Sequence, residues 1–278
     1  MNTFQRVIKY VAIGFAVFLT VVILTSIVSV LTGVISIFNG KEGKKIEFSK
    51  EFSDSHIDQL DINNNLGKII VKTGSEFRVE ATNVSERFRA EAVNGTLIID
   101  EPDYTRWLKW LKVDKNRTKS VISVYVPEDF YARRIKIDSG VGEVKLENLS
   151  TDRLIINGGV GDIYGKGLRA MRVDADGGVG NMNFVDVDFT DVDFDSGVGE
   201  ISINGQIKGR SEFDCGIGNV NIIIKGARDD YALKINSGLG GVRVNDKRVS
   251  REYKDNYQAD NIIRIDGGVG SVDISFSH

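Results

Sequence analysis

Apolar and polar residues alternate along most of the chain, and a short glycine-rich phrase interrupts the alternation at regular intervals. One copy is Asp-Ser-Gly-Val-Gly-Glu-Val-Lys-Leu at residues 138–146. Apolar residues stand three positions before the first glycine, directly after it, and four and six positions after it. Alternation with a period of two sends one set of side chains to a core and the other to water, as in a β-strand. The pattern therefore predicts two short strands joined by a glycine corner.

The phrase recurs to the C-terminus, which predicts a solenoid. Its first glycine occurs at 140, 159, 178, 197, 216, 238 and 268, so the spacing is 19 four times, then 22, then 30. A fixed period of about 20 residues is typical of folds in which each repeat stacks on its neighbours. We expect an all-β, single-stranded β-solenoid or β-helix-like domain with coils of about 19 residues. The predicted turn residues are Gly140, Gly142, Gly159, Gly161, Gly178, Gly180, Gly197, Gly199, Gly216, Gly218, Gly238, Gly240, Gly268 and Gly270.

The composition of the corner has a structural explanation. Glycine allows positive φ and close backbone approach, and the Asp or Asn before the corner can form an Asx-turn. Residues 56–71 read as a degenerate first copy with Asn65 in place of the first glycine. Asn tolerates positive φ better than most residues, which explains that substitution.

The hydrophobic pattern divides the chain into four segments. Residues 1–10 form a predicted cytoplasmic tail, and 11–39 form an uncharged apolar run that is long enough to cross a bilayer as an uncleaved signal-anchor helix. Residues 40–55 form a linker, and 56–278 form the solenoid, irregular over 56–133 and regular over 134–278. Lysines and arginines flank both ends of the apolar run, so charge alone leaves its orientation open.

The irregular part contains strand signals and one basic insert. Strands are predicted at Phe77–Thr82, Phe88–Ala92 and Val121–Pro127, and Asn94-Gly95 predicts a tight hairpin. The insert that begins at Tyr104 and continues to Ser120 contains both tryptophans and many basic residues. Two interpretations remain open: a cap on the open end of the solenoid, or a contact with an anionic lipid or cell-wall polymer. The candidate interface residues are Trp107, Lys109, Trp110 and Lys112.

Charge and cysteine content exclude several functions. A net charge of −3 gives no support for nucleic-acid binding. The single cysteine, Cys215, occupies a small-residue position of a repeat and excludes an intrachain disulfide. The nine-residue calcium roll is excluded because its ligand position holds Ile163, Met182 and Val272. The aspartate-rich stretch 174–195 is interpreted as a solvated strand face, with a weak cation site as the alternative. No cofactor is predicted.

The N-terminal apolar run, the strand ending Val124-Tyr125-Val126-Pro127, and Ile135–Gly142 with its repeats resemble a known family. It is the bacterial family of proposed adhesins built from β-strand repeats, which includes LiaG-like membrane-anchored envelope proteins. The resemblance covers roughly residues 46–278. It implies a β-solenoid outside the cytoplasmic membrane, links some members to cell-envelope stress, and carries over no catalytic residues.

These observations predict a single-pass, membrane-anchored extracytoplasmic protein that is not an enzyme. It would act as a cell-surface interaction or envelope-stress-associated module whose partner is an anionic lipid, a cell-wall polymer or another envelope protein. A polysaccharide-active β-helix enzyme and a purely structural scaffold remain as alternatives. The enzyme is disfavoured because His56 and His278 are the only histidines and no nucleophile or phosphate-binding motif occurs.

Overall fold

The computed structural model describes residues 45–53, 56–102, 119–256 and 258–277. The chain divides into two compact units, one of Met1–Glu42 and Asp103–Thr118 and the other of Gly43–Pro102 and Lys119–His278. All described residues belong to the second unit. The predicted tail, the apolar run and the four candidate interface residues at 107–112 lie outside the described residues.

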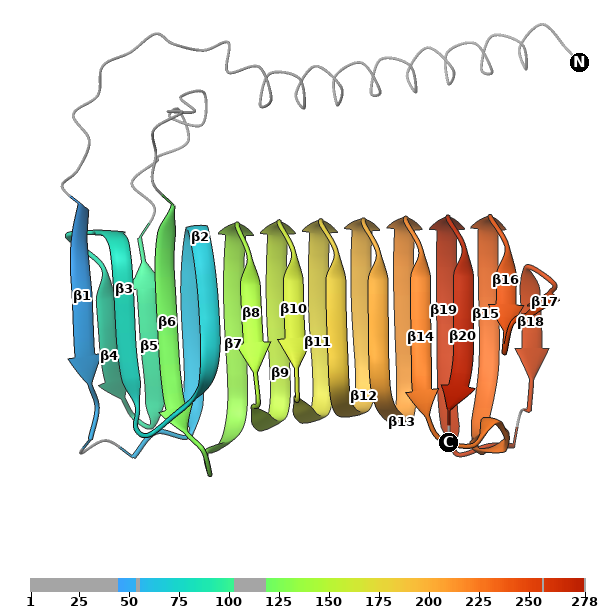
Figure 1. The fold of residues 1–278 in the computed structure, drawn as a ribbon, viewed down its shortest axis with the longest axis horizontal. Coiled ribbons are helices and arrows are strands. Elements are labelled where there is room, and N and C mark those ends of the chain that lie inside the picture. Colours follow the sequence, from blue (N-terminus) through green and yellow to red (C-terminus); the bar gives the residue numbers. More distant parts are fainter. Residues whose placement is uncertain (1–44, 54–55, 103–118, 257, 278) are drawn as a thin grey trace, which may run out of the picture. The chain divides into compact units, whose positions relative to one another are not determined.

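The described unit is all-β apart from one short 3₁₀-helix, η1, at Arg228–Asp230. Its twenty strands belong to one hydrogen-bonded sheet that winds into a solenoid (Figure 1). The strands are β1 Lys45–Glu51, β2 Gln59–Gly74, β3 Arg78–Ser85, β4 Arg89–Val93, β5 Thr96–Glu101, β6 Ser120–Pro127, β7 Tyr131–Val141, β8 Val144–Glu147, β9 Ser150–Val160, β10 Ile163–Lys166, β11 Arg169–Val179, β12 Met182–Val198, β13 Ile201–Ile217, β14 Val220–Lys225, β15 Tyr231–Leu239, β16 Val242–Val244, β17 Lys247–Val249, β18 Glu252–Asp255, β19 Asn261–Val269 and β20 Val272–Ser277.

Each regular coil has one strand that leads into the glycine corner and one that leads away from it. β7 leads in and β8 leads away, and the next coil repeats this with β9 and β10 (Figure 1). Equivalent residues of successive coils pair in parallel, as Val144 does with Ile163 and Ile163 with Met182. This register places all corners along one side of the solenoid, here named the corner edge, and the remaining turns along the opposite edge.

The coils at the N-terminal end do not follow chain order. β2 is the first complete coil in the sequence, yet it lies between the coil of β5 and β6 and the coil of β7 and β8. β2 agrees in register with the degenerate copy predicted at 56–71, because Asn64 pairs with Ser139 and Leu66 with Val141.

The C-terminal end is interleaved in the same way. The last coil, β19 and β20, lies between the coil of β13 and β14 and the coil of β15 and β16. The 30-residue spacing before the last corner has a structural cause, since the chain after β16 adds two strands to the outermost coil before it returns to the inner position at β19. β17 and β18 in this segment pair antiparallel with β16 and β15.

The outermost strands at both ends of the solenoid pair antiparallel with their neighbours and carry many charged residues. β1 and β4 flank one end, β17 and β18 flank the other, and in the described part of the chain each of the four pairs with a single neighbour. Charged side chains on edge strands oppose further strand addition. The charged residues are Lys45, Glu47, Lys50, Glu51, Arg89, Glu91, Lys247, Arg248, Glu252, Lys254 and Asp255.

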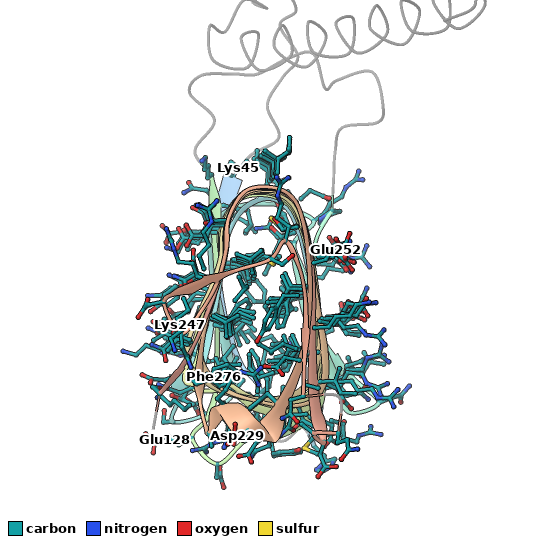
Figure 2. The ribbon with its side chains drawn as sticks, turned by 90° about the vertical axis from the view of Figure 1, so that its right-hand side faces the viewer. Lys45, Glu128, Asp229, Lys247, Glu252 and Phe276 are labelled. Carbon is teal, nitrogen blue, oxygen red and sulfur yellow. The ribbon has the colours of Figure 1, made fainter. Side chains whose placement is uncertain are left out.

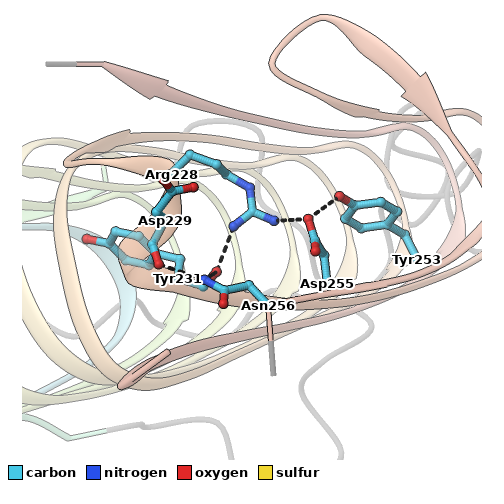
Figure 3. A network of polar contacts seen from close by, with 6 residues as sticks. All are labelled: Arg228, Asp229, Tyr231, Tyr253, Asp255 and Asn256. Atoms are coloured by element: carbon cyan, nitrogen blue, oxygen red, sulfur yellow. Dashed lines mark hydrogen bonds and ion pairs between the residues drawn. The ribbon is translucent and has the colours of Figure 1, made fainter. Parts of the chain in front are cut away.

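A polar network fixes the C-terminal addition to the solenoid (Figure 3). The Arg228 guanidinium donates to the Tyr231 carbonyl at 2.6 Å and to the Asp255 carboxylate at 2.7 Å. The Tyr253 hydroxyl donates to the same carboxylate at 2.7 Å. The Asn256 amide donates to the Asp229 carbonyl at 2.6 Å. The hydrogen bond from Tyr253 and the charge of Arg228 lower the pKa of Asp255. β18 and η1 are thereby joined through side chains as well as through the sheet.

The core runs along the inside of the solenoid, with the largest side chains at its centre (Figure 2). Phe184, Phe189, Phe194 and Phe213 are fully buried. Their ring centroids lie 5.0 Å apart for Phe184 and Phe194 and 5.8 Å apart for Phe194 and Phe213. The pairing partner of Phe184 in the preceding coil is Gly165, and that of Phe194 is Ala175. The aromatic rings therefore fill space that two small residues of the neighbouring coil leave open.

The structure confirms some sequence predictions and corrects others. The hairpin at Asn94-Gly95 is present, with φ of 49° and 78°, and it joins β4 to β5. Residues 45–51, predicted as linker, form β1 instead, because Ile46 and Phe48 pack against the core while polar residues alternate with them. Within the ranges that the structure describes, no helix has the length and apolar character needed to span a membrane.

Candidate functional site

The two glycines of each corner are required for different reasons. The second glycine has φ between 141° and 153° in the corners from Gly142 to Gly270. A Cβ there would lie 1.6–2.0 Å from the carbonyl oxygen of the glycine stacked below it. The first glycine does not have positive φ, but its Cβ would lie 2.2–2.7 Å from a neighbouring carbonyl oxygen. Of the two reasons expected for glycine, positive φ therefore applies at the second position only. Close stacking of backbones explains the first glycine.

Asn65 stands in place of the first glycine in the first corner, and positive φ does not explain its position either. It does not have positive φ, so tolerance of that conformation does not explain its place in the first corner. Its side-chain amide instead donates to the carbonyl oxygen of Glu101 at 3.5 Å. The side chain thus links this corner to the strand of the outer neighbouring coil.

The residue between the two glycines forms an exposed apolar row along the corner edge. The structure pairs these residues from coil to coil, so that they follow one line. Seven of them are 43–64% exposed, and they account for most of the large exposed hydrophobic side chains in the described residues. The row, here named the apolar ridge, consists in spatial order of Leu66, Val141, Val160, Val179, Val198, Ile217, Val269 and Leu239.

A row of carboxylates lies beside the ridge on the strands that lead into the corners. Asp176, Asp195, Asp214 and Asp266 pair in succession across β11, β12, β13 and β19. A second row, two residues earlier, joins Asp174, Asp193 and Glu212. We name these seven residues the acidic face. Strand neighbours are about 4.8 Å apart, so like charges lie close together along both rows.

The carboxylates of the acidic face are poorly compensated. In the described part of the chain only Asp174 has an ion pair, to Arg153 at 3.5 Å. Burial and then the neighbouring carboxylates raise the pKa of Asp176, Asp193, Asp195 and Asp214. One oxygen of Asp214 is buried without a hydrogen-bond partner. The surface therefore holds concentrated negative charge that a cationic partner would stabilise.

The predicted Asx-turns at the corners are not formed by the aspartates. Asp138 accepts from the Lys136 ammonium and the Asn157 amide, which are side chains and not the backbone of its own turn. The one Asx-type bond at a corner joins the Leu66 N–H to Asn64 at 3.3 Å. The aspartate side chains point outward from the strand, so they contact neighbouring coils or solvent.

A groove of about 510 Å³ overlaps the second row of the acidic face and brings opposite charges together. Its lining includes Arg153, Arg172, Arg210 and Arg264 together with acidic residues of β11 to β13. Asp191 and Arg210, which line the groove, lie where the pairing of β12 with β13 shifts its register, between Thr190 and Val192. Arg172 and Arg210 lie two residues before Asp174 and Glu212, on the side away from the ridge, and Arg264 pairs with Glu212 at the end of the second row.

The remaining candidate residues are structural or lie elsewhere. Cys215 is 3% exposed, burial raises its thiol pKa, and Sγ contacts the Gly199 carbonyl at 3.5 Å. Thiolate chemistry is not favoured in that environment. Across residues 45–53, 56–102, 119–256 and 258–277, no three potential ligand side chains come close enough to hold a metal ion. The weak cation site considered as the alternative for 174–195 thus has no ligand cluster among these residues.

The family model for Toastrack DUF4097 matches residues 57–206 and again 133–275. These two matches cover most of the chain. The chain belongs to the Toastrack DUF4097 family. None of the curated proteins matches it.

Solved structures with a similar arrangement share little sequence with this Toastrack chain. A proposed cell adhesion protein from Clostridium sporogenes is 20% identical, with a TM-score of 0.41 over 84% of this chain and 100% of that one. A proposed adhesin from Bacteroides fragilis is 15% identical, with a TM-score of 0.45 over 84% and 100%. A proposed adhesin from Parabacteroides distasonis is 14% identical, with a TM-score of 0.41 over 85% and 98%.

Sequence reasoning identified only part of the Toastrack surface. The fixed period predicts that Asp176, Asp195, Asp214 and Asp266 form a ladder along the corners, and the structure pairs them in this order. Glu212 was not predicted to lie beside the aspartate-rich stretch 174–195, and the coil register places it there. The ridge residues were recognised as apolar, yet their exposure was not predicted. Their position between two glycines was the available signal, because a corner that tight has no interior for its central side chain.

Proposed function

We propose that the protein is a membrane-anchored, non-catalytic interaction module that binds a basic surface of another envelope protein through its acidic face. The observation that carries the proposal is the pair of carboxylate rows, in which six of the seven residues have no ion pair among the described residues. A basic partner would relieve their mutual repulsion, while anionic lipid or an anionic wall polymer would increase it.

The anchor in this proposal rests on sequence. The uncharged run at 11–39 is long enough to cross a bilayer, and the family resemblance favours an extracytoplasmic solenoid. Labelling of an introduced exposed cysteine on intact cells tests the orientation. A solenoid that is shielded from an impermeant reagent would contradict it.

Binding of a basic probe tests the acidic face. The probe is a poly-lysine peptide, titrated calorimetrically into the full chain at low salt. Replacing Asp176, Asp195 and Asp214 by Asn should raise the Kd about tenfold, since three partly exposed charge pairs of roughly 0.5 kcal/mol each are lost. Added salt should reduce the difference.

A matched triple variant distinguishes binding at the acidic face from a general effect of the protein's net charge. Glu86→Gln, Glu128→Gln and Asp129→Asn remove the same charge from exposed positions outside the acidic face. This variant should bind poly-lysine nearly as well as the wild type. Equal weakening by both triple variants would show that only net charge matters, and the proposed site would be rejected.

A further inference from the structure

The apolar ridge is a continuous surface with no function in the fold. Its eight residues follow one another at the strand spacing, so the ridge extends about 34 Å along the corner edge. The half-exposed side chains are small aliphatic groups on a convex edge of glycine backbone. Soluble surfaces rarely keep apolar side chains in so long an uninterrupted row, which indicates that something covers the ridge.

The chain enters the described unit at the same edge. Lys45 begins β1 and pairs with Ser85, whose N–H donates to the Glu101 carboxylate at 2.9 Å at the end of β5. Glu101 in turn pairs with Asn64 beside the first corner. Figure 2 shows Lys45 at the corner edge, with Glu128 and Asp229 at the opposite edge. The N-terminal segment therefore joins the solenoid beside one end of the ridge.

Chain length limits how far this edge can lie from the end of the apolar run. Six residue steps separate Asn39 from Lys45. A fully extended chain covers at most about 3.6 Å per residue, so the distance is at most about 22 Å. If the run at 11–39 crosses a bilayer, the corner edge near β1 is held close to the surface of that bilayer.

The charged residues on both sides of the ridge limit the kind of surface that can bind to it. The acidic face lies on one side, and Glu143, Asp162 and Glu200 follow the corners on the other. Two copies packed ridge to ridge would bring these carboxylates together, and an anionic bilayer would repel them. A phospholipid surface with no net charge offers the ammonium or choline groups of its zwitterionic headgroups to the carboxylates, and its acyl boundary to the aliphatic side chains.

We propose that the apolar ridge rests in the headgroup region of a zwitterionic phospholipid bilayer with no net charge, so that the solenoid lies with its corner edge along the membrane. This inference rests on the anchor of the proposed function but uses a different surface from the acidic face. It leaves the acidic face and the opposite edge accessible to a partner protein.

Environment-sensitive labels on the ridge test the proposal. The full chain carries Cys215→Ser, a residue type that equivalent coils hold at this position, plus one new cysteine labelled with NBD. It is placed as single copies in nanodiscs of phosphatidylcholine and phosphatidylethanolamine. Labels at Val141→Cys and Ile217→Cys should both show blue-shifted emission and quenching by nitroxide lipids. A label at Asp229→Cys on the opposite edge should show neither.

The position dependence separates docking from simple tethering. A tether alone would bring Val141 near the lipid but leave Ile217 in water, and that result would overturn the proposal. A blue shift at Ile217 only when several copies share a membrane, without lipid quenching, would assign the ridge to contacts between copies and would also overturn it. Failure of the chain to enter nanodiscs would contradict the anchor and, with it, this inference; poly-lysine binding would still report separately on the acidic face.

Charged substitutions provide a second readout. Val160→Asp together with Val198→Asp should return a label at Val179→Cys to the water-exposed emission, because both neighbours on the ridge would then resist contact with lipid. Met171→Asp together with Ile98→Asp is the matched control, since both side chains lie off the ridge and are 58% and 41% exposed. This control should leave the Val179→Cys label quenched. Equal quenching in all variants would overturn the proposal.

Discussion

At the corner edge every regular coil carries the same two glycines, whereas in the core behind it equivalent positions range from Gly165 to Phe184. The corner stacks backbone on backbone, with no side chain in between that could adjust. The core stacks side chains, so a small residue in one coil is offset by a large one in the next. The same residue type is therefore required in every coil where main chains contact each other, whereas residue size can vary between coils where side chains fill the core.

The largest expected effect is at a corner glycine in the middle of the solenoid. Gly199→Ala should lower the free energy of unfolding by about 4 kcal/mol or more. Gly199 has a φ of 149°, and its Cβ would lie 1.8 Å from the Gly180 carbonyl oxygen. Urea denaturation followed by circular dichroism measures the loss.

The control for Gly199→Ala is another glycine at the same edge. Gly241 has no heavy atom within 4 Å of the position its Cβ would occupy. Gly241→Ala should therefore change stability by no more than about 0.5 kcal/mol. Similar losses for both substitutions would show that backbone stacking is not the cause.

A smaller effect is expected in the core, where a neighbour can compensate. A Cβ at Gly165 would lie 2.4 Å from the Phe184 ring, so Gly165→Ala should cost about 2 kcal/mol. Phe184→Leu leaves a partial cavity and carries its own cost. The double variant should lose less than the sum of the two, by about 1 kcal/mol, in a double-mutant cycle. Strict additivity would mean that the two coils do not compensate each other.

A still smaller effect is expected at the opposite edge. Gly167 has a φ of 64°, which Asn tolerates, and the nearest atom to its Cβ is the Asn148 side-chain oxygen rather than backbone. Gly167→Asn should cost about 1 kcal/mol or less by the same urea measurement. A loss as large as that of Gly199→Ala would remove the distinction between the two edges.

The smallest predicted effect concerns the charge of the acidic face. Burial and neighbouring carboxylates raise the pKa of Asp195, so the folded state binds more protons than the unfolded state between the ordinary value of 3.8 and the raised one. Stability contributed by this group therefore falls as pH rises through that window. Asp195→Asn should raise the Tm by about 1–2 °C at pH 7.

Thermal melts at several pH values test the sign of this effect. The Tm advantage of Asp195→Asn should shrink as the pH is lowered, because the wild-type carboxyl is then neutral in both states. Asp129→Asn, outside the acidic face, serves as the comparison and should give a smaller advantage at pH 7. A constant Tm difference across the whole range would contradict the assigned repulsion.

The parts of the fold that depend on local pattern could be predicted from sequence. The corners, the strands and the hairpin at Asn94-Gly95 follow from glycine spacing and from alternation over a few residues. The order of coils could not, because strand pairing at both ends joins segments that are not consecutive in the chain. The sequence around the last corner, at Gly268, does not indicate where its coil stacks. The same local pattern would suit a coil at the outer end of the solenoid and one inserted beside β13.

The candidate surfaces show the same limit. The nineteen-residue period places Asp176, Asp195 and Asp214 in one predicted ladder, whereas Glu212 joins Asp174 and Asp193 only through the observed parallel pairing across the coils. Apolar residues between two glycines were expected at every corner. Their exposure follows from the geometry of the turn, which leaves no interior for a side chain at its apex.

The sequence alone determined that this protein is a repeat of strands and glycine corners with an apolar run before it. Those features depend on backbone conformation and side-chain alternation within about twenty residues. Tertiary structure decided which coils are neighbours, that Glu212 lies beside the predicted aspartate ladder, and that an apolar residue at each corner faces solvent. Each of these depends on contacts between residues nineteen or more positions apart, which no local pattern specifies.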